Sequence, residues 1–188
     1  LTAAANLVSR KTLGLFYQRF LFQHPSSSMS AFADVKDLPT KRVPLTVDNL
    51  KPALLASGAI PLVIAPVRHI PGAGFGHFVD GGITDYHFDW PFSSKGLVLY
   101  PHFYPHLTPG WFDKALSWRR AKPAHLHNVV LLCPTDSWVA SLPFGKIPDR
   151  NDFKLPDAVR INYWQEVITR SHELAEAFSR GQYQVEAL

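Results

Sequence analysis

The sequence predicts an α/β fold in which helices flank a mostly parallel sheet, and three observations support this class. The 188 residues, 46% of them hydrophobic and 18% charged, are enough to build one domain with a hydrophobic core. Short continuous apolar runs at residues 61–67, 96–101 and 127–134 are typical of strands covered on both faces of a parallel sheet. A long amphipathic pattern over residues 157–180 predicts a helix. We therefore expect a single α/β domain over residues 1–188.

Two helices are expected in the N-terminal part of the chain. Residues 1–24 carry apolar side chains at helical spacing and predict the first helix. The segment 37–46 contains two prolines and is expected to be extended, because a residue before proline avoids the α region. The second helix is predicted over residues 48–58, with Asp48 as N-cap and Gly58 at its end.

The middle of the chain predicts a strand, a turn and the end of another strand. The apolar run "PLVIAPV" at 61–67 is expected to be a buried strand. The glycine-rich "IPGAGFGH" at 70–77 predicts a turn. The following "HFVD" at 77–80 is expected to end a strand, which places Asp80 at its carboxyl end.

The C-terminal half predicts two more strands and the clearest helix. The strands are expected at "GLVLYP", residues 96–101, and "HNVVLLCP", residues 127–134. The helix runs from Asp157 to Arg180, and Gly181 lies just past its end. Its apolar stripe consists of Val159, Tyr163, Val167, Leu174 and Phe178.

Composition and charge exclude several classes of protein. The net charge is +4, and the 19 Lys and Arg residues are scattered, so we expect no nucleic-acid partner. The single cysteine, Cys133, excludes an internal disulfide and a multi-cysteine zinc site, and is expected to pack as a small buried hydrophobe. No apolar run approaches the ~20 residues of a membrane-spanning helix. We expect a cytoplasmic protein or one bound peripherally to a membrane.

Asp80 and the two glycines that follow it have two interpretations. In open α/β sheets, ligands gather at the carboxyl ends of strands, where the Asp80 carboxylate would act as a base or orient one. Gly81 or Gly82 would then adopt positive φ, and the two glycines would allow close approach of another backbone segment or a substrate. The alternative is structural, since Asp-Gly is a common turn sequence.

The stretch "ALLASGAIPLVIAPV" at 53–67, followed by "VDGG" at 79–82, resembles the C-terminal half of the patatin-like phospholipase domain. That family carries its helix, "AIP" and "DGG" segments in this order and at about this spacing. The resemblance implies that Asp80 is the base of a Ser–Asp catalytic dyad, which acts on lipid or phospholipid esters without a metal or another cofactor. The active-site floor would be supported by Ser57, Ala59, Ile60 and Pro61, with Gly81 and Gly82 beyond the base.

The sequence departs from the family pattern at the nucleophile. No serine lies in a G-x-S-x-G elbow, and the glycine-rich oxyanion segment is absent too. We therefore expect an N-terminally truncated domain of a lipid acyl hydrolase, whose serine lies outside this chain. Alternatively, the chain is a non-catalytic lipid-binding or protein-interaction module, or a separate chain supplies the serine. A sheet without its N-terminal strands would also expose an edge, so self-association or a covering partner is expected.

Three histidine-containing groups are candidate metal sites, and we expect a metal at none of them. Asp85, His87 and Asp89 alternate, so on a strand they would share a face, and a solvated polar strand face is the preferred interpretation. The pair His102 and His106 is interrupted by proline. The pair at 125 and 127 flanks a predicted strand, without the further ligands that a zinc site needs.

The aromatic stretch at residues 100–120 has two interpretations. Trp111, Phe112 and Trp118 are followed by Arg119 and Arg120, and aromatic side chains beside basic ones suit a lipid–water interface. The preferred interpretation is that the aromatic side chains pack in the core and the arginines are solvated.

Overall fold

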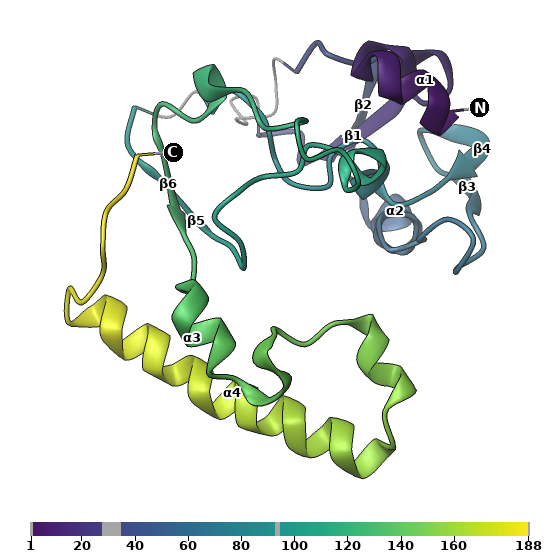
Figure 1. The fold of residues 1–188 in the computed structure, drawn as a ribbon. Coiled ribbons are helices and arrows are strands. Elements are labelled where there is room, and N and C mark those ends of the chain that lie inside the picture. Colours follow the sequence, from purple (N-terminus) through teal and green to yellow (C-terminus); the bar gives the residue numbers. More distant parts are fainter. Residues whose placement is uncertain (1, 28–34, 93–94, 188) are drawn as a thin grey trace. The chain divides into compact units, whose positions relative to one another are not determined.

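The computed structural model describes residues 2–27, 35–92 and 95–187. The chain divides into two compact units. The first contains residues 1–98 and 106–128, and the second contains residues 99–105 and 129–188 (Figure 1). The expectation of one domain over the whole chain stays a prediction.

The N-terminal segment is helical only at its start. Helix α1 (Thr2–Val8) is followed by a short 3₁₀ helix, η1 (Arg10–Leu15), and then by strand β1 (Arg19–Gln23). Strand β1 pairs in parallel with β2 (Thr40–Pro44), so the predicted helix over residues 1–24 is wrong in its second half. The sequence of β1 is rich in aromatic and apolar side chains, which favour strands when a neighbouring strand covers them.

Helix α2 (Val47–Ser57) confirms the second predicted helix, but its N-cap is Thr46 and not Asp48. The N–H of Asn49 donates to Thr46 Oγ1 over 3.3 Å, and the Thr46 N–H donates to Asn49 Oδ1 over 2.8 Å, which is a reciprocal capping box. The buried Asn49 amide also donates to the carbonyl oxygens of Pro44 and Pro71. One side chain thus joins the start of α2 to the segments on either side of it.

The predicted strand at 61–67 is a turn over most of its length. Strand β3 (Val67–Ile70) begins only at its last residue and pairs antiparallel with β4 (Gly74–Phe78). Pro61 and Pro66 have no N–H to donate to a ladder, which disfavours a strand interior. The glycine-rich turn is shorter than predicted, and both Gly72 and Gly74 adopt positive φ there.

The core of the first unit lies where β2, α2 and the β3–β4 hairpin meet. Phe20 of β1 packs edge-on against Phe78, with ring centroids 5.0 Å apart. Farther along, the same unit contains three more short 3₁₀ helices, η2 (Gly81–Ile83), η3 (Trp111–Asp113) and η4 (Pro123–His125). The buried core residues are Val43, Ala56, Ile70, Ala73 and Phe78.

In the second unit the structure confirms both predicted strands and the long helix. Strand β5 (Val98–Pro101) pairs with β6 (Val129–Leu132). Its first residue, Val98, is counted with the first unit. Helix α3 (Asp136–Ala140) and two 3₁₀ helices, η5 (Pro143–Gly145) and η6 (Arg150–Lys154), lead to helix α4 (Asp157–Ser179).

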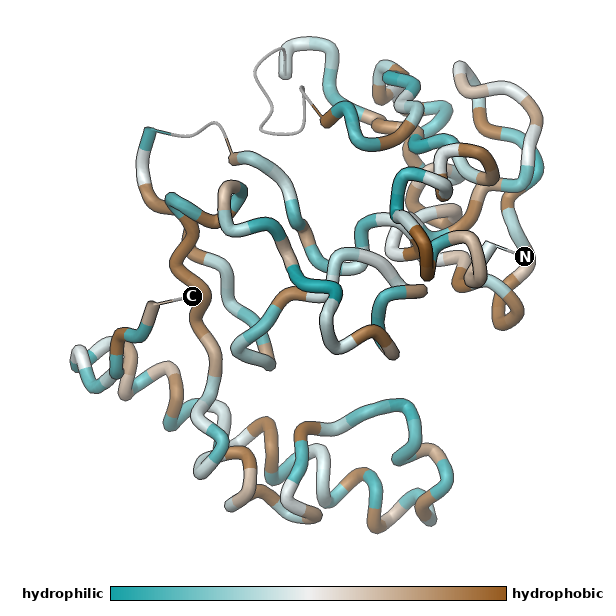
Figure 2. Tube along the Cα trace, turned by 45° about the horizontal axis from the view of Figure 1, so that its top comes forward, coloured by the Kyte–Doolittle hydropathy of each residue, from teal (hydrophilic) through white to brown (hydrophobic). Residues whose placement is uncertain are grey.

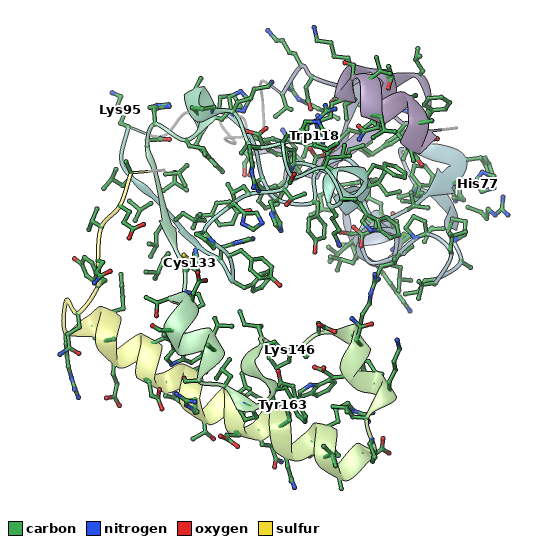
Figure 3. All side chains as sticks on the ribbon, in the orientation of Figure 1. His77, Lys95, Trp118, Cys133, Lys146 and Tyr163 are labelled. Atoms are coloured by element: carbon green, nitrogen blue, oxygen red, sulfur yellow. The ribbon has the colours of Figure 1, made fainter. Side chains whose placement is uncertain are left out.

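The ends and the covered face of α4 follow the sequence pattern only in part. Arg180 caps the helix, and Gly181 has a φ of +69°. Tyr163 is buried and donates to the Lys146 carbonyl (Figure 3), whereas Val159 and Phe178 of the predicted stripe are exposed. The stripe is therefore covered between its two ends, most fully at Tyr163, and is exposed at Val159 and Phe178.

The α/β class is confirmed at the level of mixed helices and small sheets. In the part of the chain that the structure describes, each sheet has two strands. The β1–β2 pair is parallel and the β3–β4 pair is antiparallel, so these pairs do not form one covered parallel sheet. Cys133, expected to be buried, is half-buried beside β6, and its burial raises the pKa of the thiol.

Candidate functional site

Asp80 lies two residues after β4 and is the N-cap of η2. Its Oδ1 accepts a 2.7 Å hydrogen bond from the Gly82 N–H, and the residue is half-buried. Among the hydrogen bonds that the described residues form, none goes to Asp80 Oδ2. The carboxylate is thus held through one of its two oxygens.

The two glycines after Asp80 do not adopt positive φ, so that part of the prediction is wrong. Gly82 instead permits a close approach: a Cβ atom there would lie 3.1 Å from Asp80 Oδ1, nearer than most real Cβ contacts. A Cβ on Gly81 would meet nothing within 4 Å. Gly82 is therefore the residue that needs to be small. Its N–H binds Asp80 Oδ1, and a side chain on Gly82 would crowd the same oxygen.

The two motifs that the sequence separates by about 20 residues meet in the fold. The Asp80 N–H donates to the Ala59 carbonyl over 3.0 Å. Ala59 is fully buried, and Ile60 and Pro61 continue from it into the turn before β3. Ser57 is exposed at the last residue of α2. The short helix end and the Asp-Gly-Gly segment thus form one local structure.

A pocket of about 470 Å³ opens beside this structure. Pro61 of the first motif and Ile83, just after the second, both line it. The volume falls in the range of sites for small organic ligands, and the lining suits an apolar group. The remaining lining residues are Tyr17, Leu62, Trp111 and Phe112.

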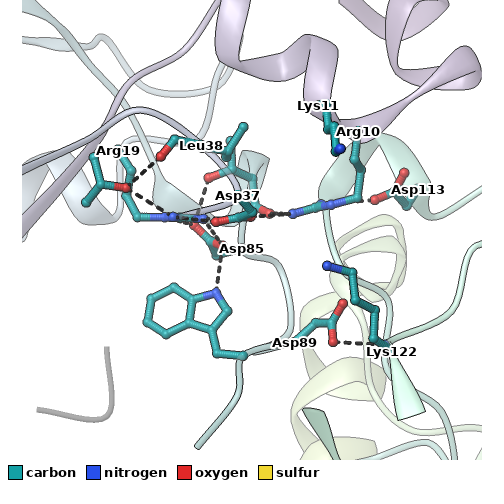
Figure 4. A network of polar contacts seen from close by, with 12 residues as sticks. Arg10, Lys11, Arg19, Asp37, Leu38, Asp85, Asp89, Asp113 and Lys122 are labelled. Carbon is teal, nitrogen blue, oxygen red and sulfur yellow. Dashed lines mark hydrogen bonds and ion pairs between the residues drawn. The ribbon is translucent and has the colours of Figure 1, made fainter. Parts of the chain in front are cut away.

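A buried ion-pair network anchors the segment that follows Asp80 (Figure 4). Arg19 of β1 donates to both Asp85 oxygens over 2.8 and 2.7 Å and to Asp37 over 2.9 Å. Trp90 Nε1 donates to Asp85 Oδ1 over 3.0 Å. Burial alone would lower the Arg19 pKa, but its hydrogen bonds to Asp85 and Asp37 raise it above the ordinary value. Arg19 is therefore a permanent cation that ties β1 to the 80–90 segment.

The three alternating side chains that the sequence offers as metal ligands bind separate partners. Asp85, His87 and Asp89 do not lie on a strand, so the predicted polar strand face is wrong. Asp85 binds Arg19, His87 Nδ1 accepts from the Thr108 N–H, and Asp89 accepts from the Lys122 N–H. Each side chain is bound by a partner from a different segment of the chain, so the three do not converge.

One histidine of each pair lies against an oxygen atom of the protein. His102 Nδ1 lies 2.9 Å from the Tyr104 carbonyl oxygen, while His125 Nδ1 lies 3.0 Å from Asp89 Oδ1. Within residues 2–27, 35–92 and 95–187, no group of three or more His, Cys, Asp or Glu side chains is arranged to hold a metal ion.

The aromatic stretch divides between the two interpretations. Trp111 and Phe112 are half-buried and line the pocket. Trp118 is 68% exposed (Figure 3), which does not fit core packing. Arg119 is not simply solvated, because it donates to the Asn6 carbonyl over 3.0 Å.

A second buried carboxylate, Asp113, gave no signal in the sequence. Its side chain is fully buried, and it accepts from Asn6 Nδ2 over 2.7 Å and from Arg10 over 3.2 Å. These bonds join α1 and η1 to η3, which carries two of the pocket residues. Like the Arg19 network, this cluster holds the walls of the site and does not line it.

Two further findings bear on the candidate site. None of the described helices is long and apolar enough to cross a membrane. Comparisons of the chain with models of protein families, with curated proteins and with solved structures find no match.

Proposed function

We propose that this chain is part of a lipid acyl hydrolase of the patatin-like kind, with Asp80 as the base of a Ser–Asp dyad. The observation that carries the proposal is the 3.0 Å hydrogen bond from the Asp80 N–H to the Ala59 carbonyl. It joins the helix–"AIP" segment to the "DGG" segment, the two motifs on which the resemblance rests. The substrate would be a carboxylic ester of a lipid or phospholipid.

The geometry around Asp80 suits a base that contacts a serine directly. The Gly82 N–H fixes one carboxylate oxygen at 2.7 Å, which orients the group and leaves Oδ2 to accept a proton. A serine hydroxyl supplied from outside this chain would give its proton to Asp80 as its oxygen attacks the ester carbonyl. Asp80 would pass this proton to the oxygen of the leaving alcohol. It would later take a proton from the water that attacks the acyl-serine ester, and return it to the serine oxygen as the free acid leaves.

The pocket beside the motifs supports an apolar substrate. Its lining is dominated by apolar and aromatic side chains, and Pro61 and Ile83 bring it next to both motifs. Burial of a hydrocarbon chain is favourable by about 0.8 kcal/mol per methylene, so a pocket of this kind would hold an acyl chain while the ester lies near Asp80.

The hydrogen bond within the motif also supports a second candidate. An aspartate that accepts from the N–H two residues later is an ordinary turn former, and Asp80 does so. The alternative function is a non-catalytic lipid-binding or interaction module with the same fold. It keeps the pocket and gives Asp80 only the capping role.

The substitution Asp80→Asn in the full-length protein separates the two candidates. Asn can cap η2 as Asp does but cannot accept the serine proton. If Asp80 is the base, kcat for lipid-ester hydrolysis falls by about 10²–10⁴-fold, and KM stays near its original value. Steady-state kinetics with a phospholipid and a short ester measure this.

The matched control is Asp48→Asn, an exposed aspartate in the first turn of α2, which is expected to keep its kcat. Melting curves of both variants show whether the fold is intact, and Asp80→Ser provides a second substitution that can still cap. An Asp80→Asn variant that retains full kcat refutes the dyad.

A further inference from the structure

The turn at residues 60–64, between α2 and β3, carries apolar side chains that face solvent. Leu62 is fully exposed, and Val63 and Ile64 are 70% and 51% exposed. These residues form a continuous hydrophobic stretch along the chain (Figure 2). Three neighbouring large apolar side chains exposed on one turn are unusual unless they contact something.

Leu62 also adopts a strained backbone. Its φ is +67°, in the left-handed region that bulky residues rarely occupy. Asn or Gly would relieve the strain, and a polar side chain would be better solvated. Neither packing within the unit nor backbone geometry favours leucine here, which points to a contact outside the described residues.

The backbone of the turn is already prepared for an apolar environment. The Ile60 carbonyl accepts from the Val63 N–H over 3.1 Å and from the Ile64 N–H over 2.9 Å. Pro61 and Pro66 have no N–H. An unsatisfied N–H is expensive to move out of water, so these two internal bonds lower the cost of bringing the turn into a hydrocarbon layer.

The segments before and after the turn in the sequence are basic and apolar. On α2, Val47, Leu50 and Leu54 recur at helical spacing and are all exposed. Between Leu38 and Val79 the sequence has four Lys or Arg residues and a single carboxylate, Asp48. An apolar surface with an excess of positive charge matches a bilayer that carries anionic lipids. The basic residues are Lys41, Arg42, Lys51 and Arg68.

The turn is also a wall of the pocket. Pro61 and Leu62 line it together with Ile83. A turn that enters a lipid layer would therefore bring the mouth of an apolar pocket to the acyl chains. This continuity favours a lipid surface over a protein partner as the occupant.

We propose that the turn at residues 60–64 inserts into the surface of an anionic bilayer, with the exposed face of α2 lying along it. Its role in delivering substrate rests on the proposed function, but the binding itself does not require Asp80. The two proposals can therefore fail separately.

Vesicle binding of the full-length protein tests the insertion. The probes are phosphatidylcholine vesicles with and without phosphatidylserine, measured by co-sedimentation. Wild type is expected to prefer the anionic vesicles, and Leu62→Asn to lose about tenfold or more in affinity, as one leucine leaves the apolar layer. The matched control Leu15→Asn removes a leucine that is 81% exposed on η1, and is expected to bind like wild type. Equal binding by all three proteins, or no binding by wild type, overturns the proposal.

The substitution Leu62→Trp identifies the occupant directly. The added tryptophan fluorescence of each variant is its emission minus that of wild type. Vesicles of brominated lipids are expected to quench the added fluorescence of Leu62→Trp but not that of Leu15→Trp. If another protein segment covers the turn, the added emission is blue-shifted before vesicles are present and resists quenching, which contradicts the proposal. Asp80→Asn is expected to bind vesicles like wild type, so lost binding and lost hydrolysis are told apart.

Discussion

Two regions of the first unit place their side chains in opposite ways. Around Arg19, charged groups are buried and bound to one another, with Arg19 and Asp85 only 7% and 9% exposed (Figure 4). At the turn of residues 60–64, apolar groups lie in water. The network is explained by folding, because every buried charge in it has a partner. Folding does not explain the exposed apolar side chains of the turn. We therefore look for a function in the turn and not in the network.

The largest effect is expected from breaking the network at Asp85. In Asp85→Ala the buried Arg19 keeps only Asp37 as an acidic partner, and the hydrogen bond from Trp90 Nε1 to Asp85 is lost. Removing one partner of a buried ion pair destabilises a protein by about 3–5 kcal/mol. The free energy of unfolding in urea, followed by circular dichroism, measures this.

Two further variants sharpen that test. Glu166→Ala removes an exposed carboxylate on α4 and is expected to change stability by no more than about 0.5 kcal/mol. The double variant Arg19→Met/Asp85→Leu is expected to be more stable than Asp85→Ala, because it leaves no uncompensated charge of the pair. A loss below about 1 kcal/mol in Asp85→Ala would mean that the network contributes little.

A smaller effect is expected from Asp37, the more exposed carboxylate of the network. Burial alone would raise its pKa, but the hydrogen bond and charge of Arg19 lower it below the ordinary value of 3.8. A lowered pKa stabilises the folded protein at pH values above the unfolded pKa, and this stability is lost as pH falls through the lower folded pKa. The stability of wild type should therefore decline below about pH 4.

Asp37→Asn removes the titrating group and should flatten this part of the pH profile. The flattening should be partial, because Asp37 is a third exposed and Arg19 keeps Asp85. Thermal melts of both proteins at a series of acidic pH values measure the difference. Parallel profiles for the two proteins would assign the acid sensitivity to other carboxylates.

The elements that could be predicted from the sequence are those with a local cause. Helix α4 has a long periodic pattern and a glycine just past its end, and β5 and β6 are short apolar runs. The predictions were wrong where contacts with distant segments or backbone hydrogen bonding determine the structure. Residues 19–23 have helical spacing but pair with β2, and the run at 61–67 is apolar but contains two prolines that prevent a ladder.

The site divides in the same way. Asp80 and Ala59 were singled out from their motifs, and the fold joins them by a hydrogen bond. The network of Arg19, Asp37 and Asp85 was missed, because its members come from three segments and Arg19 lay in a predicted helix. No local spacing encodes an ion pair between residues 66 positions apart. The positive φ expected after Asp80 was wrong, because Gly81 and Gly82 form a short 3₁₀ helix, which needs only negative φ.

The smallest effect concerns Leu62, and it has the opposite sign to the others. If the turn retains leucine for a contact and not for folding, then Leu62→Asn should leave the isolated protein as stable as wild type or more so. The left-handed region is disfavoured by about 1–2 kcal/mol per residue for ordinary side chains, and Asn tolerates it better, so a gain of up to about 1 kcal/mol is expected. No core contact is lost, because Leu62 is fully exposed. Urea unfolding without lipid measures the gain, and Leu15→Asn is the control with no strain to relieve. A clear loss of stability in Leu62→Asn would show that the leucine packs against the protein, and would weaken the contrast between the turn and the network.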